Sequence, residues 1–178
     1  MRFVPTDIGG VIVVEAEPHR DERGHFARTH CPEEFARAGH PFIPVQTSIS
    51  HNPRAGTLRG MHYQPVPYAE TKLVRAVRGR IHDVALDLRP DSSTYKRWTA
   101  AELSADNGRA LLIPEGVAHG FLTLEPDSDI LYQIAPMFMP GHGRAVRWND
   151  PAFAIAWPGE PTMISAADAN LPDFVEAG

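Results

Sequence analysis

Turn-forming residues recur along this sequence at short intervals, and that spacing restricts the fold more than any other feature. The chain has 14 glycines and 17 prolines among 178 residues, a larger share than in an average protein. Breaks such as Asn52-Pro53 and Asp106-Asn107-Gly108 separate short runs that have the composition of strands. The predicted strands are residues 11–15, 45–50, 57–64, 72–77, 80–88, 98–103, 110–113, 120–124 and 130–134. So many short strands without intervening helices predict an all-β antiparallel sandwich or barrel.

Helices are expected at only two places. Pro32 begins the first, with two acidic residues in its first turn, and Gly39 ends it. Ser165 carries a helix-start signal for one or two short turns near the end of the chain. The polar residues 17–24 are expected to form a loop. The length, together with the lack of an internal repeat or linker, predicts a single domain over residues 1–178.

Charge and cysteine content restrict the partners and the compartment. The net charge is −5 and the sequence pI is about 6.0, and no run of five or more basic residues occurs, so no nucleic-acid partner is expected. Single basic residues beside glycine or histidine suit a small anionic ligand instead. Cys31 is the only cysteine, which excludes an intrachain disulfide. We see no signal segment and no apolar run of about 18 residues, and therefore expect a cytoplasmic protein with no membrane partner.

The segment LRGMHYQ at residues 58–64 contains the first candidate for chemistry. Side chains alternate between the two faces of a strand, so His62 shares a face with Gly60 and Gln64. A histidine beside a glycine has space around its ring for a ligand. The alternative is a core histidine that is hydrogen-bonded to a backbone carbonyl.

A second histidine lies in a motif that resembles the second motif of the cupin superfamily. The residues with that spacing are Gly108, Pro114, Gly116 and His119. In many cupins this histidine binds a metal, together with a His-x-His pair and a glutamate. Here the corresponding segment reads His62-Tyr63-Gln64 with Glu70 beyond it, so one imidazole is missing. An amide is a poor replacement for imidazole on Fe, Zn or Mn, and we predict no metal and no other cofactor.

Three further polar side chains lie within predicted strands. Lys72 opens one strand, and Asp83 shares a strand face with Asp87 among small or apolar neighbours. Such carboxylates are either solvated or paired inside a pocket, and the sequence leaves both possibilities open. Tyr132 is in the middle of a strand, where packing is the usual role of a tyrosine.

Seven short motifs, taken jointly and in order, resemble the dTDP-4-dehydrorhamnose 3,5-epimerase family. They are DERG at 21–24, LRGMHYQ at 58–64, KLVR at 72–75, DVALDLR at 83–89, PEGVAHGF at 114–121, LY at 131–132 and RWNDP at 147–151. The resemblance implies a cupin-type double-stranded β-helix, or jelly roll, that is metal-independent and works as a homodimer. It also implies an isomerase that inverts C3 and C5 of dTDP-4-keto-6-deoxy-D-glucose to give dTDP-4-keto-L-rhamnose, on the route to dTDP-L-rhamnose.

The resemblance also implies catalytic roles. His62 matches the base that removes a proton next to the ketone. Asp168 matches the carboxylate that fixes the imidazole, with Asp83 as a competing partner. Lys72 matches the cation that stabilises the C4 oxyanion. Tyr132 matches the acid that returns a proton from the opposite face.

A substrate-binding set follows from the same resemblance. It comprises Arg23, Arg28, Gln46, Ser48, Arg59, His119 and Phe138. Guanidinium groups such as those of Arg23 and Arg59 suit diphosphate oxygens, and Phe138 could stack on thymine. Arg28 stands where the family has an acid, in a segment that lies near the expected nucleotide site or in the second subunit of the dimer.

Departures from the family pattern leave the exact base, the sugar and inversion at C5 open. The differences include Ala27-Arg28-Thr29, Gln46-Thr47-Ser48, Met137-Phe138 and Ala167. One alternative is an enzyme that inverts only C3 of a related dTDP-4-keto-deoxysugar. A second is a metal-dependent cupin oxygenase or isomerase that uses His62, Gln64 and His119. A third is a sugar-nucleotide-binding cupin without turnover.

Overall fold

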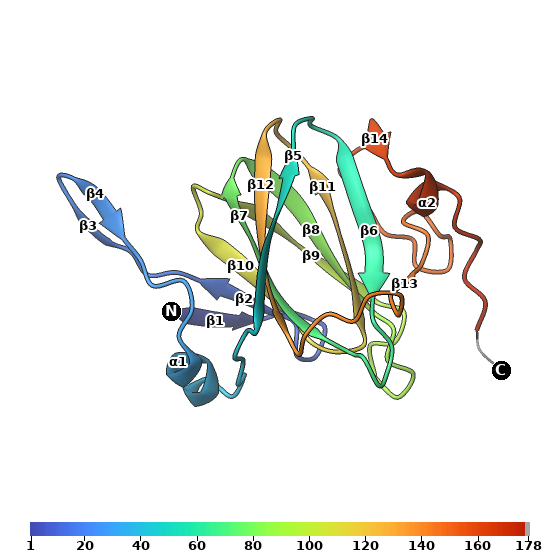
Figure 1. Cartoon of the computed structure of the whole chain (residues 1–178), viewed down its shortest axis with the longest axis horizontal. Helices are drawn as coiled ribbons and strands as arrows, with labels where there is room; N and C mark the ends of the chain where they lie inside the picture. Colours follow the sequence, from blue (N-terminus) through green and yellow to red (C-terminus); the bar gives the residue numbers. More distant parts are fainter. Residues whose placement is uncertain (177–178) are drawn as a thin grey trace.

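The short strands pair into two antiparallel sheets that pack face to face in the computed structural model, which describes residues 1–176 (Figure 1). The first sheet has the order β1 (Arg2–Pro5), β2 (Ile12–Glu15), β10 (Arg109–Ile113), β7 (Thr71–Arg78), β12 (Ser128–Ala135) and β5 (Gln46–Asn52). The second has the order β13 (Arg144–Ala145), β6 (Thr57–Tyr63), β11 (Val117–Thr123), β8 (Arg80–Asp87) and β9 (Trp98–Ser104). A further strand, β14 (Met163–Ile164), pairs parallel to β6.

The core between the sheets follows from the alternation of side chains along the strands. Val74 and Ala76 on β7 pack in one buried cluster with Ala85 on β8. By the same alternation, Lys72 on β7 and Asp83 on β8 lie on these inner faces. Polar groups are therefore directed into the space between the sheets, at positions where neighbouring side chains form the core.

Each sheet is covered on its outer face. The helix α1 (Pro32–Arg37) buries Phe35 against the first sheet, and it has a proline at its start and acidic residues in its first turn, as its N-terminus favours. Residues of the C-terminal third, among them Phe153 and Ile155, pack on the second sheet. A final short helix, α2 (Ala166–Ala169), lies beside β6 (Figure 1).

Two glycines allow β6 and β11 to approach closely. A Cβ atom added at Gly60, which has φ +139, would lie 2.5 Å from the Cα of Gly120, and one added at Gly120 would lie 2.9 Å from the backbone oxygen of Arg59. Only glycine fits such a contact. The pairing places His62 directly opposite His119 across the two strands.

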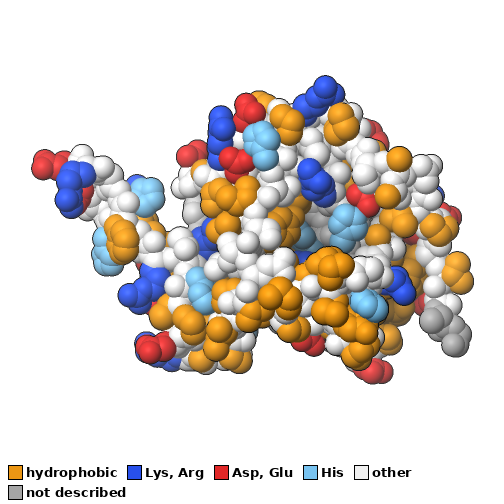
Figure 2. Space-filling model, in the orientation of Figure 1, with side chains coloured by type: hydrophobic (Ala, Val, Ile, Leu, Met, Phe, Trp, Pro, Cys, Tyr) orange, Lys and Arg blue, Asp and Glu red, His pale blue; other side chains and the backbone are white. Residues whose placement is uncertain are grey.

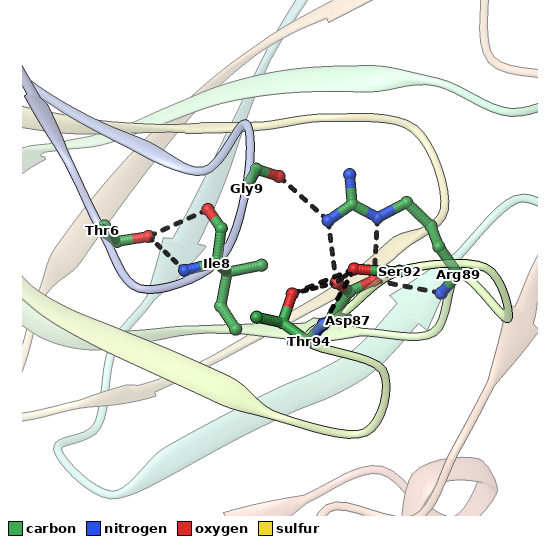
Figure 3. A network of polar contacts seen from close by, with 7 residues as sticks. All are labelled: Thr6, Ile8, Gly9, Asp87, Arg89, Ser92 and Thr94. Atoms are coloured by element: carbon green, nitrogen blue, oxygen red, sulfur yellow. Dashed lines mark hydrogen bonds and ion pairs between the residues drawn. The ribbon is translucent and has the colours of Figure 1, made fainter.

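A polar network joins the N-terminal turn to the end of β8 (Figure 3). The buried carboxylate of Asp87 accepts hydrogen bonds from Arg89, Ser92 and Thr94, and Arg89 also donates to the backbone oxygen of Gly9. The sequence left open whether Asp87 is solvated or paired, and the structure shows that it is paired.

The expected all-β fold with short helices is confirmed, and each predicted strand matches an observed one to within three residues at either end. The prediction of a loop over residues 17–24 is wrong. That segment contributes to a hairpin of β3 (His19–Asp21) and β4 (Gly24–Phe26), which projects from the body of the molecule (Figures 1 and 2). Its strand residues are all exposed, so no buried face gave the sequence a strand pattern. No helix within residues 1–176 is long and apolar enough to cross a membrane.

Candidate active site

A cavity of about 760 Å³ opens between the two sheets. It lies among β6, β7, β11 and β12, which supply Arg59, His62, Lys72, His119 and Tyr132 to its lining. Six of the residues predicted from the sequence line it: Arg59, His62, Lys72, His119, Tyr132 and Phe138. The cavity thus brings together predicted residues as far apart in the chain as Arg59 and Phe138, which are separated by 79 positions.

His62 is held by a carboxylate from the C-terminal segment. Its Nε2 lies 2.7 Å from Oδ1 of Asp168, while the His62 side chain is half exposed and that of Asp168 is 10% exposed. Two features fix Asp168: β14 pairs with β6, and the backbone N–H of Asp168 donates to the hydroxyl of Ser165, which caps α2. The Nδ1 atom of His62 is then the ring nitrogen left for a ligand.

A second aspartate–histidine pair is buried more deeply. Nε2 of His119 lies 2.7 Å from Oδ1 of Asp83, and both side chains are almost fully buried. Asp83 therefore pairs with His119. The sequence had left Asp83 and Asp168 as alternative partners of His62, and the structure pairs His62 with Asp168. The ring of His119 lies edge-on to that of Tyr132, with centroids 5.7 Å apart.

Tyr132 and Lys72 complete the polar wall of the cavity. Burial raises the pKa of the Tyr132 phenol well above its usual value, and the negative charge of Asp83 raises this pKa further. The phenol is consequently held in its protonated form. Nζ of Lys72 lies 2.9 Å from Oε1 of Glu70, and both side chains are at least 90% buried.

Comparison with known proteins assigns the chain to a family. The profile of the dTDP-4-dehydrorhamnose 3,5-epimerase family matches residues 5–176. The chain belongs to this family. The epimerase of that name from Methanothermobacter thermautotrophicus is 41% identical over 172 residues, which cover 95% of this chain and 92% of the relative.

Solved structures of the epimerase family have the same fold. The Bacillus anthracis dTDP-4-dehydrorhamnose 3,5-epimerase, with TDP and PPi bound, is 38% identical and has a TM-score of 0.93, covering 97% of this chain and 99% of that one. ChmJ, a 3′-monoepimerase from Streptomyces bikiniensis in complex with dTDP-quinovose, is 31% identical with a TM-score of 0.88, covering 96% and 86%. The expected cupin-type jelly roll is confirmed by these relatives.

The remaining residues of the predicted set lie outside the cavity lining. Gln46 is near it, since its side-chain oxygen accepts from the backbone N–H of Phe138, and Ser48 lies opposite Tyr132 in the register of β5 and β12. Arg23 is exposed in the hairpin, where it pairs with Asp21. Arg28 pairs with Glu34 at 2.7 Å, next to α1. A single copy of this epimerase-family chain therefore does not bring the two arginines to its own cavity.

Several lining residues were not predicted as site residues. Glu70, Tyr63, Arg144 and Leu171 all contribute to the cavity wall. Glu70 lies one residue before β7 begins at Thr71, and only its closeness to Lys72 in the chain pointed to it. Arg144 could not be found in this way, because its two-residue strand β13 shows no alternation.

The metal-dependent alternative has no support in the donor set. Within residues 1–176, no group of three His, Cys, Asp or Glu side chains is arranged to hold a metal ion. Of the three ligands considered for that reading, Gln64 has both amide atoms bonded to the backbone of Met139. His62 and His119 each have one nitrogen bonded to a carboxylate.

Proposed function

We propose that this chain inverts C3 and C5 of dTDP-4-keto-6-deoxy-D-glucose to give dTDP-4-keto-L-rhamnose, without a metal or other cofactor. The observation that carries the proposal is one cavity that contains an imidazole, an ammonium and a phenol, from His62, Lys72 and Tyr132. The names of the curated relatives support the reaction, and the TDP bound to the Bacillus anthracis enzyme supports the nucleotide. We place the reaction in the cytoplasm, since a chain whose single cysteine is Cys31 has no intrachain disulfide that would need an oxidising compartment.

The first step removes a proton from a carbon beside the C4 ketone. Nδ1 of His62 takes this proton, since Nε2 is engaged by Asp168. The carboxylate sets the tautomer of the neutral ring and stabilises the imidazolium that forms. The electron pair of the broken C–H bond moves to the C4 oxygen, where the ammonium of Lys72 stabilises the enolate charge.

The second step returns a proton to the same carbon from the opposite face. Tyr132 donates its phenolic hydrogen, and the electron pair of the enolate forms the new C–H bond. Because the phenol is kept protonated by its raised pKa, it is available as an acid at neutral pH. Loss of a proton on one face and gain on the other inverts the carbon, and exchange with water restores His62 and Tyr132.

The nucleotide diphosphate binds next to this catalytic group. Arg59 supplies a guanidinium to the cavity, and its Nε already donates to Asn52 at 2.9 Å, which orients the group. Phe138 offers a ring for the base, and Gln46 and Ser48 offer polar atoms nearby. His119 acts in this scheme as a hydrogen-bonding group toward the substrate.

We propose further that the chain forms a homodimer in which the hairpin of each copy reaches the cavity of the other. The hairpin projects from the body (Figure 1), and Phe26, the last residue of β4, is 76% exposed. Among residues 1–176, β5 is at an open sheet edge and carries the exposed Ile49, with Val45 exposed just before it. An open sheet edge with exposed apolar side chains is typical of a surface that a second chain covers. In this arrangement Arg23 and Arg28 bind the substrate of the second copy.

Hydrogen exchange tests the proposed reaction directly. The substrate is incubated with the protein in heavy water, and deuterium at C3 and C5 is followed by NMR. His62→Ala should reduce exchange at both carbons by roughly 10²–10⁴-fold or more, with dTDP affinity retained, because only the base is removed. Tyr132→Phe should slow net inversion more than exchange, since deprotonation does not need the phenol. The matched control is His40→Ala, at a histidine outside the cavity lining, which should leave exchange unchanged. Near-normal exchange in His62→Ala would contradict these roles.

A C3-only epimerase is the second candidate, and the similarity to the 3′-monoepimerase ChmJ is the observation that favours it. The same spectrum separates the two activities, since deuterium would then enter at C3 and not at C5. Tight binding of the nucleotide sugar without any exchange would instead indicate a binding protein without turnover.

A further inference from the structure

The RWNDP motif at residues 147–151 supplies none of the residues that line the cavity, yet its aspartate contacts the C-terminal segment. Asp150 is 2% exposed. One oxygen of its carboxylate accepts a hydrogen bond from the backbone N–H of Ala152 at 2.8 Å, and the other accepts one from the backbone N–H of Phe174 at 2.5 Å. Asp150 therefore joins the turn that contains it to a segment 24 positions further along the chain.

Asp168, the carboxylate that holds His62, lies in the same C-terminal segment, on a helix with little packing of its own. Of the four residues of α2, all of which the structure describes, only Asp168 is buried. A helix of a single turn is not stable by itself, and here no buried apolar side chain of α2 fixes it to the sheet. The segments on either side of α2 therefore set the position of Asp168.

Both flanking segments are fixed on the second sheet. Before α2, β14 pairs with β6. After α2, the ring of Phe174 packs on that of Phe153, with centroids 5.0 Å apart. The ion pair of Arg147 with Asp173 adds little, because the aspartate side chain is 64% exposed. The buried carboxylate of Asp150 is the stronger polar anchor, since a charged acceptor forms strong hydrogen bonds with backbone N–H groups.

We propose that Asp150 is a positioning residue, which holds the C-terminal segment on the second sheet and thereby keeps the carboxylate of Asp168 on Nε2 of His62. Without Asp150, the segment that follows α2 loses its polar anchor, and Asp168 is free to move away from the ring. A displacement of about 1 Å at a reacting group can lower a rate by about 10²-fold. This inference deepens the proposed function and rests on it, because it explains how the proposed base is held.

A double-mutant cycle with Asp168 separates positioning from a general effect on the fold. Deuterium exchange beside the ketone is measured for the unmodified protein, Asp150→Ala, Asp168→Ala and the double variant. Asp150→Ala removes both acceptor oxygens and should lower kcat roughly tenfold to a hundredfold, with KM for the nucleotide sugar nearly unchanged. In the Asp168→Ala background the same substitution should cost less than about twofold, because the contact that it positions is already absent. Equal losses in the two backgrounds would overturn the proposal.

The matched control is Asp87→Ala. Asp87 is also a buried carboxylate, but its side chain bonds to residues 89–94 and not to the C-terminal segment. This variant should be less stable, yet it should leave exchange by the folded protein unchanged. In case Asp150→Ala does not fold, Phe174→Ala removes only the ring contact. It should lower kcat severalfold in the unmodified background and not in the Asp168→Ala background, and equal losses would again overturn the proposal.

A second readout needs no substrate. The ring ¹⁵N shifts of His62 are recorded by NMR at one pH for the unmodified protein and for each variant. In Asp150→Ala they should move from the unmodified values toward those of Asp168→Ala, and unchanged shifts would overturn the proposal. If the unmodified protein shows no deuterium exchange while these shifts respond to Asp150→Ala, the proposed function fails and the role of Asp150 in holding the contact is supported.

Discussion

At the scale of single residues, the two aspartate–histidine pairs show how environment separates similar groups. His62 is half exposed toward the cavity, whereas His119 is 5% exposed and its partner Asp83 is fully buried. A base must exchange its proton with the substrate and then with water, so the accessible ring suits that role. The buried pair instead provides a fixed negative charge close to Tyr132, which favours the protonated phenol.

The titration of Tyr132 gives a test at this scale. Burial and the charge of Asp83 both raise the pKa of the phenol, so Tyr132 should stay protonated throughout the range from pH 8 to 11. The increase in tyrosinate absorbance over that range should therefore be the same in the unmodified protein and in Tyr132→Phe. A smaller increase in the variant would show that Tyr132 ionises in this range. Circular dichroism at each pH verifies that the fold is retained.

At the scale of strands and helices, the local residue pattern predicted the strands that are buried in the sheets but not the contacts between distant segments. Strands such as β7 and β8 are buried on both faces, so they are visible in the chain as short apolar runs between turn signals, and the two-residue period of a strand predicts that Asp83 and Asp87 point the same way. The hairpin β3–β4 has no buried face and left no such pattern. The contact of Asp168 with His62 joins residues 106 positions apart, and only the family resemblance indicated it, because no local periodicity reports a long-range pairing.

The network at the end of β8 gives a test at the scale of elements. Burial opposes the charge of Asp87, yet the hydrogen bonds from Arg89, Ser92 and Thr94 hold the pKa of this carboxyl below its usual range. A lowered pKa adds stability above the unfolded-state value, near 3.9, and this stability is lost as the pH falls through the folded-state value. Asp87→Asn should therefore lower the free energy of unfolding at pH 7 by about 2 kcal/mol.

The pH dependence distinguishes this effect from simple loss of packing. The gap in melting temperature between the unmodified protein and Asp87→Asn should be constant above about pH 5 and should narrow below about pH 4. Asp106→Asn, at an exposed aspartate, is the control and should change stability by less than about 0.5 kcal/mol. A gap that is independent of pH down to pH 3 would show that the charge of Asp87 does not contribute.

At the scale of the whole molecule, the substrate site that we propose is incomplete in one copy. The cavity holds the groups for proton transfer, but Arg23 and Arg28 are outside its lining, and the first of them is on a projecting hairpin with an 84% exposed side chain. A two-fold dimer makes each contact twice, so two hairpins would complete two cavities. Catalysis and assembly would then depend on one another, because a separated copy would lack part of its nucleotide site.

Mixed dimers test whether the hairpin acts on the other copy. One copy carries His62→Ala, the other carries Arg23→Ala, and dimers that contain both are isolated with two different affinity tags. If the hairpins are exchanged, one of the two cavities combines an intact His62 with an intact Arg23, and the mixed dimer should have about half of the unmodified activity. If each hairpin acts on its own cavity, no cavity has both residues, and the activity should not exceed that of the Arg23→Ala protein. Sedimentation of the unmodified protein as a monomer would also contradict the arrangement, since a monomer could not supply the second hairpin.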